Sequence, residues 1–333
     1  MKILKKILYV LLALIVLLLI IAFILPKKYE VSVSKEYNVP VELAFNAVND
    51  MKLQEKWNPW KKMDPEMKIM YGDTTVGAGA SYSWEGPVSK KGTFKYLTSE
   101  RNKEIGTEVI FEGMGDAHGK YIFDKTEGGC KITWTFEGES SIPMNLMNFL
   151  AEKYITKDFN SGLENLGELL NDRKSGKYLG YEIKEVIVPA KNYVMNRAEV
   201  KFENIAQFYA QNLGSLFQKL QTAGIEMAGM PCGLYFKYDE SKQMTDMAAA
   251  IPVKEEVAIQ DALSYHIDER KALTIDYYGD YKDIGPAHYA IDAYMKDRNI
   301  LNDAPVVEEY VTDPANEPDP TKWLTKIFYY IAE

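Results

Sequence analysis

The chain has 333 residues, 47% hydrophobic and 26% charged, a composition that is typical of folded domains and excludes a largely disordered protein. At about 150 residues per domain, this length predicts two domains. The formal net charge is −9, but without the five lysines of residues 1–28, 34 basic residues face 48 acidic ones and the balance is about −14. The negative charge of the chain after residue 28 disfavours nucleic acid as a partner and favours cationic ligands.

Cysteines and histidines are few. Cys130 and Cys232 form no CxxC pair, and we expect two separate buried thiols rather than a disulfide. His118, His266 and His288 match neither HxxxH nor HExxH spacing. The sequence therefore predicts no metal site and no cofactor.

An uncharged run of 19 residues, Ile7–Leu25, opens the chain between flanking lysines. As a helix it spans roughly 30 Å, the thickness of a bilayer core. A cleavable signal peptide is the alternative, but the run exceeds the usual ~7–15 apolar residues and no small-x-small cleavage site follows. We therefore predict a single-pass membrane anchor in residues 1–28. Three lysines and the amino terminus precede the run, against two lysines and Glu30 after it, which favours domains on the extracytoplasmic side.

Residues 29–172 combine many short strands with one long helix. A short amphipathic helix is expected at Val41–Asp50, and apolar residues from Leu146 to Leu170 repeat at helical spacing. Glycines and lysines separate the strand-like segments, as hairpin turns require. These segments are Tyr29–Tyr37, Lys68–Tyr71, Ala80–Trp84, Gly92–Leu97, Glu108–Glu112, Gly119–Asp124 and Lys131–Gly138. The pattern predicts a curved antiparallel sheet around a long C-terminal helix.

Specific residues add to this pattern: Val39-Pro40, Trp57-Asn58-Pro59-Trp60, Gly77-Ala78-Gly79-Ala80, Trp134-Thr135 and Asp158-Phe159. On these residues the segment resembles the SRPBCC superfamily of polyketide-cyclase and lipid-transfer-like proteins, which have the helix-grip fold. The resemblance implies a cavity for hydrophobic ligands between helix and sheet. We expect the tryptophans mainly in core and rim packing. No paired acid and base marks this domain as an enzyme.

After a polar linker at Asn171–Gly180, the segment 181–333 repeats itself. Val200–Ile205 corresponds to Gly279–Ile284 at a constant offset of 79 residues. Each copy follows a strand and precedes an amphipathic helix and two more strands. The expected strands are Asn192–Arg197, Gly233–Tyr238, Met247–Val253, Ala272–Tyr277, Val306–Thr312 and Trp323–Ile331. The order β–α–β–β, twice, predicts a pseudo-two-fold domain with a ligand groove between its halves, and an α+β class for the whole chain.

The strand Val306–Val311 carries two adjacent carboxylates. Alternation places Glu308 and Tyr310 on one face and Glu309 on the other, so one carboxylate should face inward. Burial of an unpaired carboxylate is costly, and a carboxylate among aromatic rings suits an apolar cation. The neighbouring aromatic residues in the pattern are Tyr277, Tyr278, Tyr281, Trp323, Phe202, Tyr235 and Phe236. Of Tyr235 and Phe236, at most one lines the pocket. A solvent-facing Glu308 and ordinary sheet packing of the rings are the alternatives.

A second resemblance rests on Gly279-Asp280-Tyr281, Glu308-Glu309-Tyr310, Thr312-Asp313-Pro314 and Lys322-Trp323. On these residues the segment is similar to the GyrI-like small-molecule-binding domain, which also forms the effector-binding half of some transcription regulators. The resemblance implies Glu308 as the central acidic ligand-binding residue, with Tyr281 and Trp323 lining the pocket. No helix-turn-helix segment is apparent, which disfavours a DNA-binding regulator. The predicted binding residues are Glu308, Tyr310, Tyr281, Tyr278, Trp323 and Tyr235.

Three functions stay open at this point. The favoured one is a membrane-anchored, non-catalytic protein that binds cationic or aromatic ligands in the second domain and hydrophobic ligands in the first. The second is a hydrolase of electrophilic small molecules in which Glu308 acts as general base through a water. The third is a membrane-tethered interaction or inhibitor module, whose acidic surface fits a basic partner.

Overall fold

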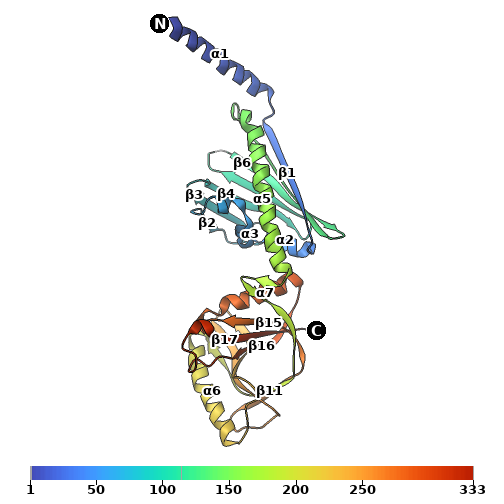
Figure 1. Ribbon diagram of the computed structural model, residues 1–333, viewed down its shortest axis with the longest axis vertical. Coiled ribbons are helices and arrows are strands. Elements are labelled where there is room, and N and C mark those ends of the chain that lie inside the picture. Colours follow the sequence, from blue (N-terminus) through green and yellow to red (C-terminus); the bar gives the residue numbers. More distant parts are fainter. Residues whose placement is uncertain (1, 114, 333) are drawn as a thin grey trace. The chain divides into compact units, whose positions relative to one another are not determined.

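The computed structural model describes residues 2–113 and 115–332, and it confirms the α+β class. The chain divides between Lys174 and Ser175 into two compact units (Figure 1). Met1, whose amino group was counted among the flanking charges, lies outside the described residues. Cys130 and Cys232 are both buried and free, as expected.

The apolar N-terminal run forms helix α1 (Lys2–Ile24). Its stretch Lys5–Ile24 is long and apolar enough to cross a membrane, and it is the one such helix in the part of the chain that the structure describes. Large side chains along it are exposed, while Ala22 near its end is fully buried.

The first unit is a seven-stranded antiparallel sheet in the order β1-β7-β6-β5-β4-β3-β2. The strands are β1 (Lys28–Tyr37), β2 (Lys68–Tyr71), β3 (Ser81–Gly86), β4 (Lys90–Glu100), β5 (Glu104–Phe111), β6 (Gly115–Thr126) and β7 (Gly129–Glu139). The helices are α2 (Val41–Asn49), α3 (Met51–Trp57), α4 (Pro59–Met63), the 3₁₀ helix η1 (Met144–Met147) and α5 (Asn148–Lys174). The two short helices α3 and α4 were not predicted. Helix α5 runs through the first residues of the expected linker and ends before Gly176, which has a φ of +85° that favours glycine.

Helix α5 packs against this sheet through one apolar stripe (Figure 1). Phe159, Leu163 and Leu166 are each at most 1% exposed and follow helical spacing. Phe159 stacks on Trp134 of β7, with ring centroids 3.7 Å apart and planes 8° from parallel. Trp57 and Trp134 are buried in this core, as the sequence suggested for packing residues.

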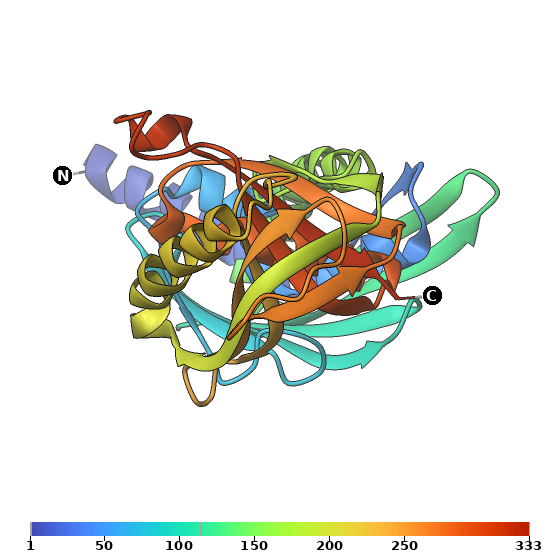
Figure 2. The ribbon, with the colours of Figure 1, turned by 90° about the horizontal axis from the view of Figure 1, so that it is seen from below.

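The second unit is an eight-stranded antiparallel sheet in the order β10-β15-β17-β16-β12-β13-β11-β14. Its strands are among the yellow-green to red arrows in Figure 2. Its strands are β10 (Lys184–Val188), β11 (Lys191–Lys201), β12 (Cys232–Asp239), β13 (Met244–Val253), β14 (Leu263–Ile267), β15 (Arg270–Tyr278), β16 (Asn302–Tyr310) and β17 (Leu324–Ile331). Helices α6 (Ile205–Thr222) and α7 (Gly285–Arg298) each follow the first long strand of one half. A small hairpin, β8 (Lys177–Tyr178) and β9 (Tyr181–Glu182), precedes the sheet. The central neighbours β12 and β16 come from different halves.

The leading strand of each half pairs with the other half. Strand β10 pairs with β15 rather than with β11, from which only two residues separate it, and β14 pairs with β11. The pairs Val188↔Arg270 and Lys191↔Ile267 continue one antiparallel register across both bends. The two sheet edges therefore meet, and the sheet curls closed around an apolar interior that includes Tyr193, Leu234 and Tyr330.

Candidate functional site

The carboxylate of Glu308 lies on β16, the strand at the junction between the halves, and its side chain is 8% exposed. His288 of α7 places Nε2 at 3.0 Å from Glu308 Oε1. The Tyr310 hydroxyl donates to Oε2 at 2.9 Å, and the Tyr235 hydroxyl of β12 lies 3.4 Å from the same oxygen. Partners from both halves thus satisfy a nearly buried carboxylate, which would be costly alone.

A second layer of hydrogen bonds supports these partners. Tyr209 of α6 donates to the Tyr235 hydroxyl at 3.0 Å, and His288 Nδ1 lies 2.9 Å from the hydroxyl of Tyr329 on β17. Burial, and next the negative charge of Glu308, raise the pKa of Tyr235 and of Tyr310 well above the ordinary value of 10.0. The pKa of Tyr209 is raised for the same reasons. These hydroxyls therefore remain protonated donors at neutral pH.

Gly233 makes room for this cluster. It lies directly opposite Glu308 in the β12–β16 ladder. A methyl group added there would overlap the Tyr209 hydroxyl and come within 2.9 Å of the Tyr310 hydroxyl. The absence of a side chain leaves space for the Tyr209 and Tyr310 hydroxyls at this position opposite Glu308.

An aromatic wall adjoins the carboxylate. The Tyr281 ring lies 5.3 Å from Tyr310 and 5.1 Å from Trp323, measured between ring centroids. The Tyr281 hydroxyl donates to the carbonyl of Thr312, and Trp323 Nε1 donates to the carbonyl of Glu317 at 2.8 Å. All three rings are partly exposed. Partly exposed aromatic residues beside a carboxylate can recognise flat or cationic ligands.

The structure brings together five of the six predicted residues, but not Tyr278. Tyr277 pairs with Thr325, which pairs with Tyr310, so Tyr277 shares the Glu308 face and Tyr278 alternates to the other. Tyr278 is 62% exposed. Glu309 also points away from Glu308, and its carboxylate pairs with Lys191 at 3.2 Å.

Of the two adjacent aromatic residues on β12, Tyr235 faces Glu308. Phe236 lies under the guanidinium of Arg197, 3.6 Å from the ring centroid, and packs edge-on against Tyr265. This agrees with the expectation that at most one of them lines the site.

Sequence reasoning missed His288 and Tyr209. Both sit on the helices rather than on the strand that drew attention. They are related by the same 79-residue offset that revealed the repeat, so equivalent positions of the two helices supply an imidazole beside the carboxylate and a phenol beside its neighbour Tyr235. That offset was the signal that could have found them.

The first unit contains a cavity of about 220 Å³. Its lining is almost wholly apolar and aromatic: Tyr29, Asn58, Trp60, Met67, Tyr82, Trp84, Ser89, Phe94, Val109, Phe111, Phe136, Ile155 and Phe159. Trp60 and Trp84 line it, whereas Trp57 and Trp134 do not. Beside it the carboxylate of Asp64 accepts hydrogen bonds from the backbone N–H groups of Val88 and Ser89 and from the Ser89 hydroxyl. These bonds, chiefly those of Ser89, lower the pKa of Asp64.

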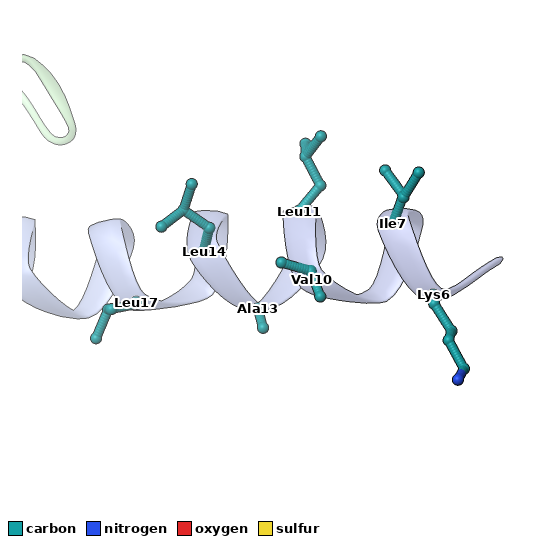
Figure 3. A pocket seen from close by; sticks show the side chains of 7 residues that line it. All are labelled: Lys6, Ile7, Val10, Leu11, Ala13, Leu14 and Leu17. Atoms are coloured by element: carbon teal, nitrogen blue, oxygen red, sulfur yellow. The ribbon is translucent and has the colours of Figure 1, made fainter. Parts of the chain in front are cut away.

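Two further groups of residues lie on the surface. A hollow along α1 is lined by Lys6, Ile7, Val10, Leu11, Ala13, Leu14 and Leu17, all side chains of this one helix (Figure 3). On the outer face of β5 and β6, ligand atoms of Glu108, Asp116 and His118 lie within 4.8 Å of one another. Asp116 and His118 are exposed, and exposed groups of this kind are common on acidic surfaces.

Comparison with known families accounts for both units. Residues 28–171 match the family described as polyketide cyclase / dehydrase and lipid transport, and residues 181–331 match the GyrI-like small molecule binding domain. Both resemblances seen in the sequence are thereby confirmed. A search of curated proteins gives no significant match.

Several solved structures are similar to this chain at low identity. The EcmrR C-terminal domain is 17% identical, over 46% of this chain and 98% of that one, with a TM-score of 0.42. SAV2435 bound to tetraphenylphosphonium is 13% identical over 45% and 94%, with a TM-score of 0.36. A hydrolase encoded by lin2189 from Listeria innocua is 12% identical over 45% and 91%, with a TM-score of 0.34. This chain therefore joins a domain of the polyketide cyclase and lipid transport family to a GyrI-like small-molecule-binding domain.

Proposed function

We propose that this protein is a membrane-anchored receptor for amphipathic small molecules, which binds apolar cations at Glu308 of the second unit and hydrophobic ligands in the cavity of the first. One observation carries the proposal for the second unit. A nearly buried carboxylate adjoins three partly exposed aromatic rings, Tyr281, Tyr310 and Trp323. Such a site attracts a hydrophobic cation by charge and by the ring faces, at roughly 0.5–2 kcal/mol per ring contact.

The test uses tetraphenylphosphonium and the full chain in detergent. The cation should raise the melting temperature of the second unit; a ligand at about 100 times its Kd stabilises by about 2.7 kcal/mol, or roughly 5–10 °C for a domain of this size. Glu308→Gln should weaken binding by roughly tenfold or more, because the charge that attracts the cation is removed.

The adjacent carboxylate offers a matched control. Glu309 lies on the opposite face and pairs with Lys191, so Glu309→Gln should leave the affinity unchanged even if it lowers stability. Tetraphenylborate has the same shape and the opposite charge, and it should not bind. Equal shifts by both ions, or equal responses of Glu308→Gln and Glu309→Gln, would refute the role of Glu308.

A hydrolase is the second candidate, and the His288–Glu308 contact at 3.0 Å favours it. The sequence indicated one acid without a partner, whereas the fold adds an imidazole beside the carboxylate. A carboxylate and an imidazole in contact can together activate a water for attack on an electrophile. Turnover of a small epoxide such as styrene oxide by the wild type, lost in both Glu308→Gln and His288→Asn, would support catalysis. Binding of the epoxide without turnover would count against the hydrolase and be consistent with the receptor.

A further inference from the structure

A cluster of large apolar side chains stands exposed where α5 begins. Met144 is 61% exposed, Met147 53% and Phe149 67%. Single exposed apolar residues are ordinary, but three within six positions at the end of a domain mark a surface that contacts something apolar.

The same segment holds the end of α1. Asn145, only 2% exposed, donates from Nδ2 to the carbonyls of Ala22 at 2.6 Å and Leu25 at 3.1 Å. Asn148 donates in the same way to the carbonyls of Pro26 and Lys27, at 3.2 and 3.0 Å. The Ala22 carbonyl is one of those that the last turn of α1 leaves without a partner, and the other three carbonyls belong to the segment that follows the helix. Segment η1 therefore packs beside the last turn of α1 (Figure 1).

The contact between η1 and the end of α1 fixes the position of η1 along the apolar run. Ala22 lies about one turn, roughly 5 Å, inside the end of the run at Leu25. If α1 crosses a bilayer, η1 lies where the hydrocarbon meets the headgroups, the depth of roughly 5–10 Å that interfacial segments occupy. In a 3₁₀ helix, residues three apart share a face. Asn145 and Asn148 thus share the face that holds α1, and Met144 and Met147 share a neighbouring one.

The charges around the cluster fit the same place. Lys27 and Lys28 follow α1, and Lys153 and Lys157 follow Phe149 one and two turns along α5; all four are exposed. Lysines beside exposed apolar side chains are typical of segments that lie in the headgroup layer, where anionic lipids attract them.

We propose that η1 and the first turn of α5 form a second membrane-contacting surface, in which Met144, Met147 and Phe149 insert into the headgroup region of the bilayer. The proposal rests on α1 being a membrane anchor. It makes the first unit lie against the lipid rather than swing from a tether, because only Pro26 and Lys27 separate the apolar run from β1. Tyr29 and Ile155, which line the cavity, come from the same ends of β1 and α5, so this surface also keeps the cavity close to the lipid.

The test places a fluorescent label in full-length protein reconstituted into phosphatidylcholine–phosphatidylglycerol vesicles. Three variants, each with one added cysteine, carry the environment-sensitive NBD group: Met147→Cys in the cluster, Leu18→Cys within α1, and Glu127→Cys as the control. Glu127 is exposed and belongs to the turn between β6 and β7, at the end of the sheet opposite to the start of β1. The native cysteines are buried, and unmodified protein treated with the label gives the background. Quenching by nitroxide lipids reports contact with the bilayer, and quenching by iodide reports contact with water.

The expected result is that the labels at 18 and 147 are quenched by nitroxide lipids and that iodide quenches the label at 147 several-fold less than the label at 127. If the label at 18 is in lipid and iodide quenches the label at 147 as strongly as the label at 127, the second surface is overturned and the anchor remains. A label at 18 in water overturns the anchor, and the second surface with it.

Discussion

Replacing Gly233 by alanine perturbs the candidate site without touching the carboxylate. The new methyl overlaps the Tyr209 hydroxyl, which must move away to an ordinary contact distance of at least 3.4 Å. The methyl also lies only 2.9 Å from the Tyr310 hydroxyl, which must shift as well. Tyr209 then loses its hydrogen bond to Tyr235, worth about 1 kcal/mol. Overpacking of a filled site costs typically 1–3 kcal/mol, so we expect the second unit to lose about 2–3 kcal/mol.

The assay is urea unfolding of the full chain, followed for the second unit by hydrogen exchange of its backbone amides. Gly214 provides the control, because it lies exposed in the middle of α6 and nothing is within 4 Å of a methyl added there. Gly214→Ala should therefore stabilise the unit by roughly 0.5–1 kcal/mol through helix propensity. The same substitution is expected to act with opposite sign at the two positions. Equal stability of Gly233→Ala and the wild type would refute the packing that we describe around Glu308.

Three further predictions concern pH, thiol reactivity and the first core. Hydrogen bonds hold the pKa of Asp64 below its ordinary value of 3.8, so they stabilise the first unit above about pH 4, and this stabilisation is lost as the pH falls through the lower pKa of the folded state. The Asp64→Asn variant should therefore have a lower melting temperature than the wild type at pH 7, and its melting temperature should fall less on acidification. Burial raises the pKa of Cys130 to about 11 and that of Cys232 further, so neither thiol should react with Ellman's reagent at pH 8 before the protein unfolds. Phe159→Ala should destabilise the first unit by about 3–5 kcal/mol in urea titrations.

Each of these has a clear contrary result. A difference in melting temperature between Asp64→Asn and wild type that is the same at pH 3 and pH 7 would exclude the ionised carboxylate as the cause. One thiol titrating in native buffer would show that a cysteine is accessible. A loss below 1 kcal/mol for Phe159→Ala would show that the stack on Trp134 contributes little.

Periodicity in the sequence was enough to predict most of the strands and the long helix α5. Strand alternation also put Glu308 and Glu309 on opposite faces, and the family resemblance then selected Glu308. Nothing in the sequence selected between Tyr277 and Tyr278, since the residue that shares the face of Glu308 is decided by the register with β17, which is a non-local pairing.

Sequence periodicity could not identify the site residues that lie on the helices α6 and α7. The spacing on α7 does not tell which side of the helix faces the sheet centre, and His288 looked like an isolated histidine. The pairing of β10 and β14 with opposite halves was equally hidden, because it joins strands about 80 residues apart in the chain.

That exchange of leading strands has a consequence for how the second unit assembles. Neither half can complete its own sheet, because each lends a strand to the other and the two exchanged ladders form one continuous register. A fragment containing one half would expose long unpaired strand edges, which invite aggregation. The duplicated halves are therefore not independent folding units, and the unit should unfold in one cooperative transition. A hinge that opens the junction at β12 and β16 is disfavoured, since it would have to break both exchanged ladders at once.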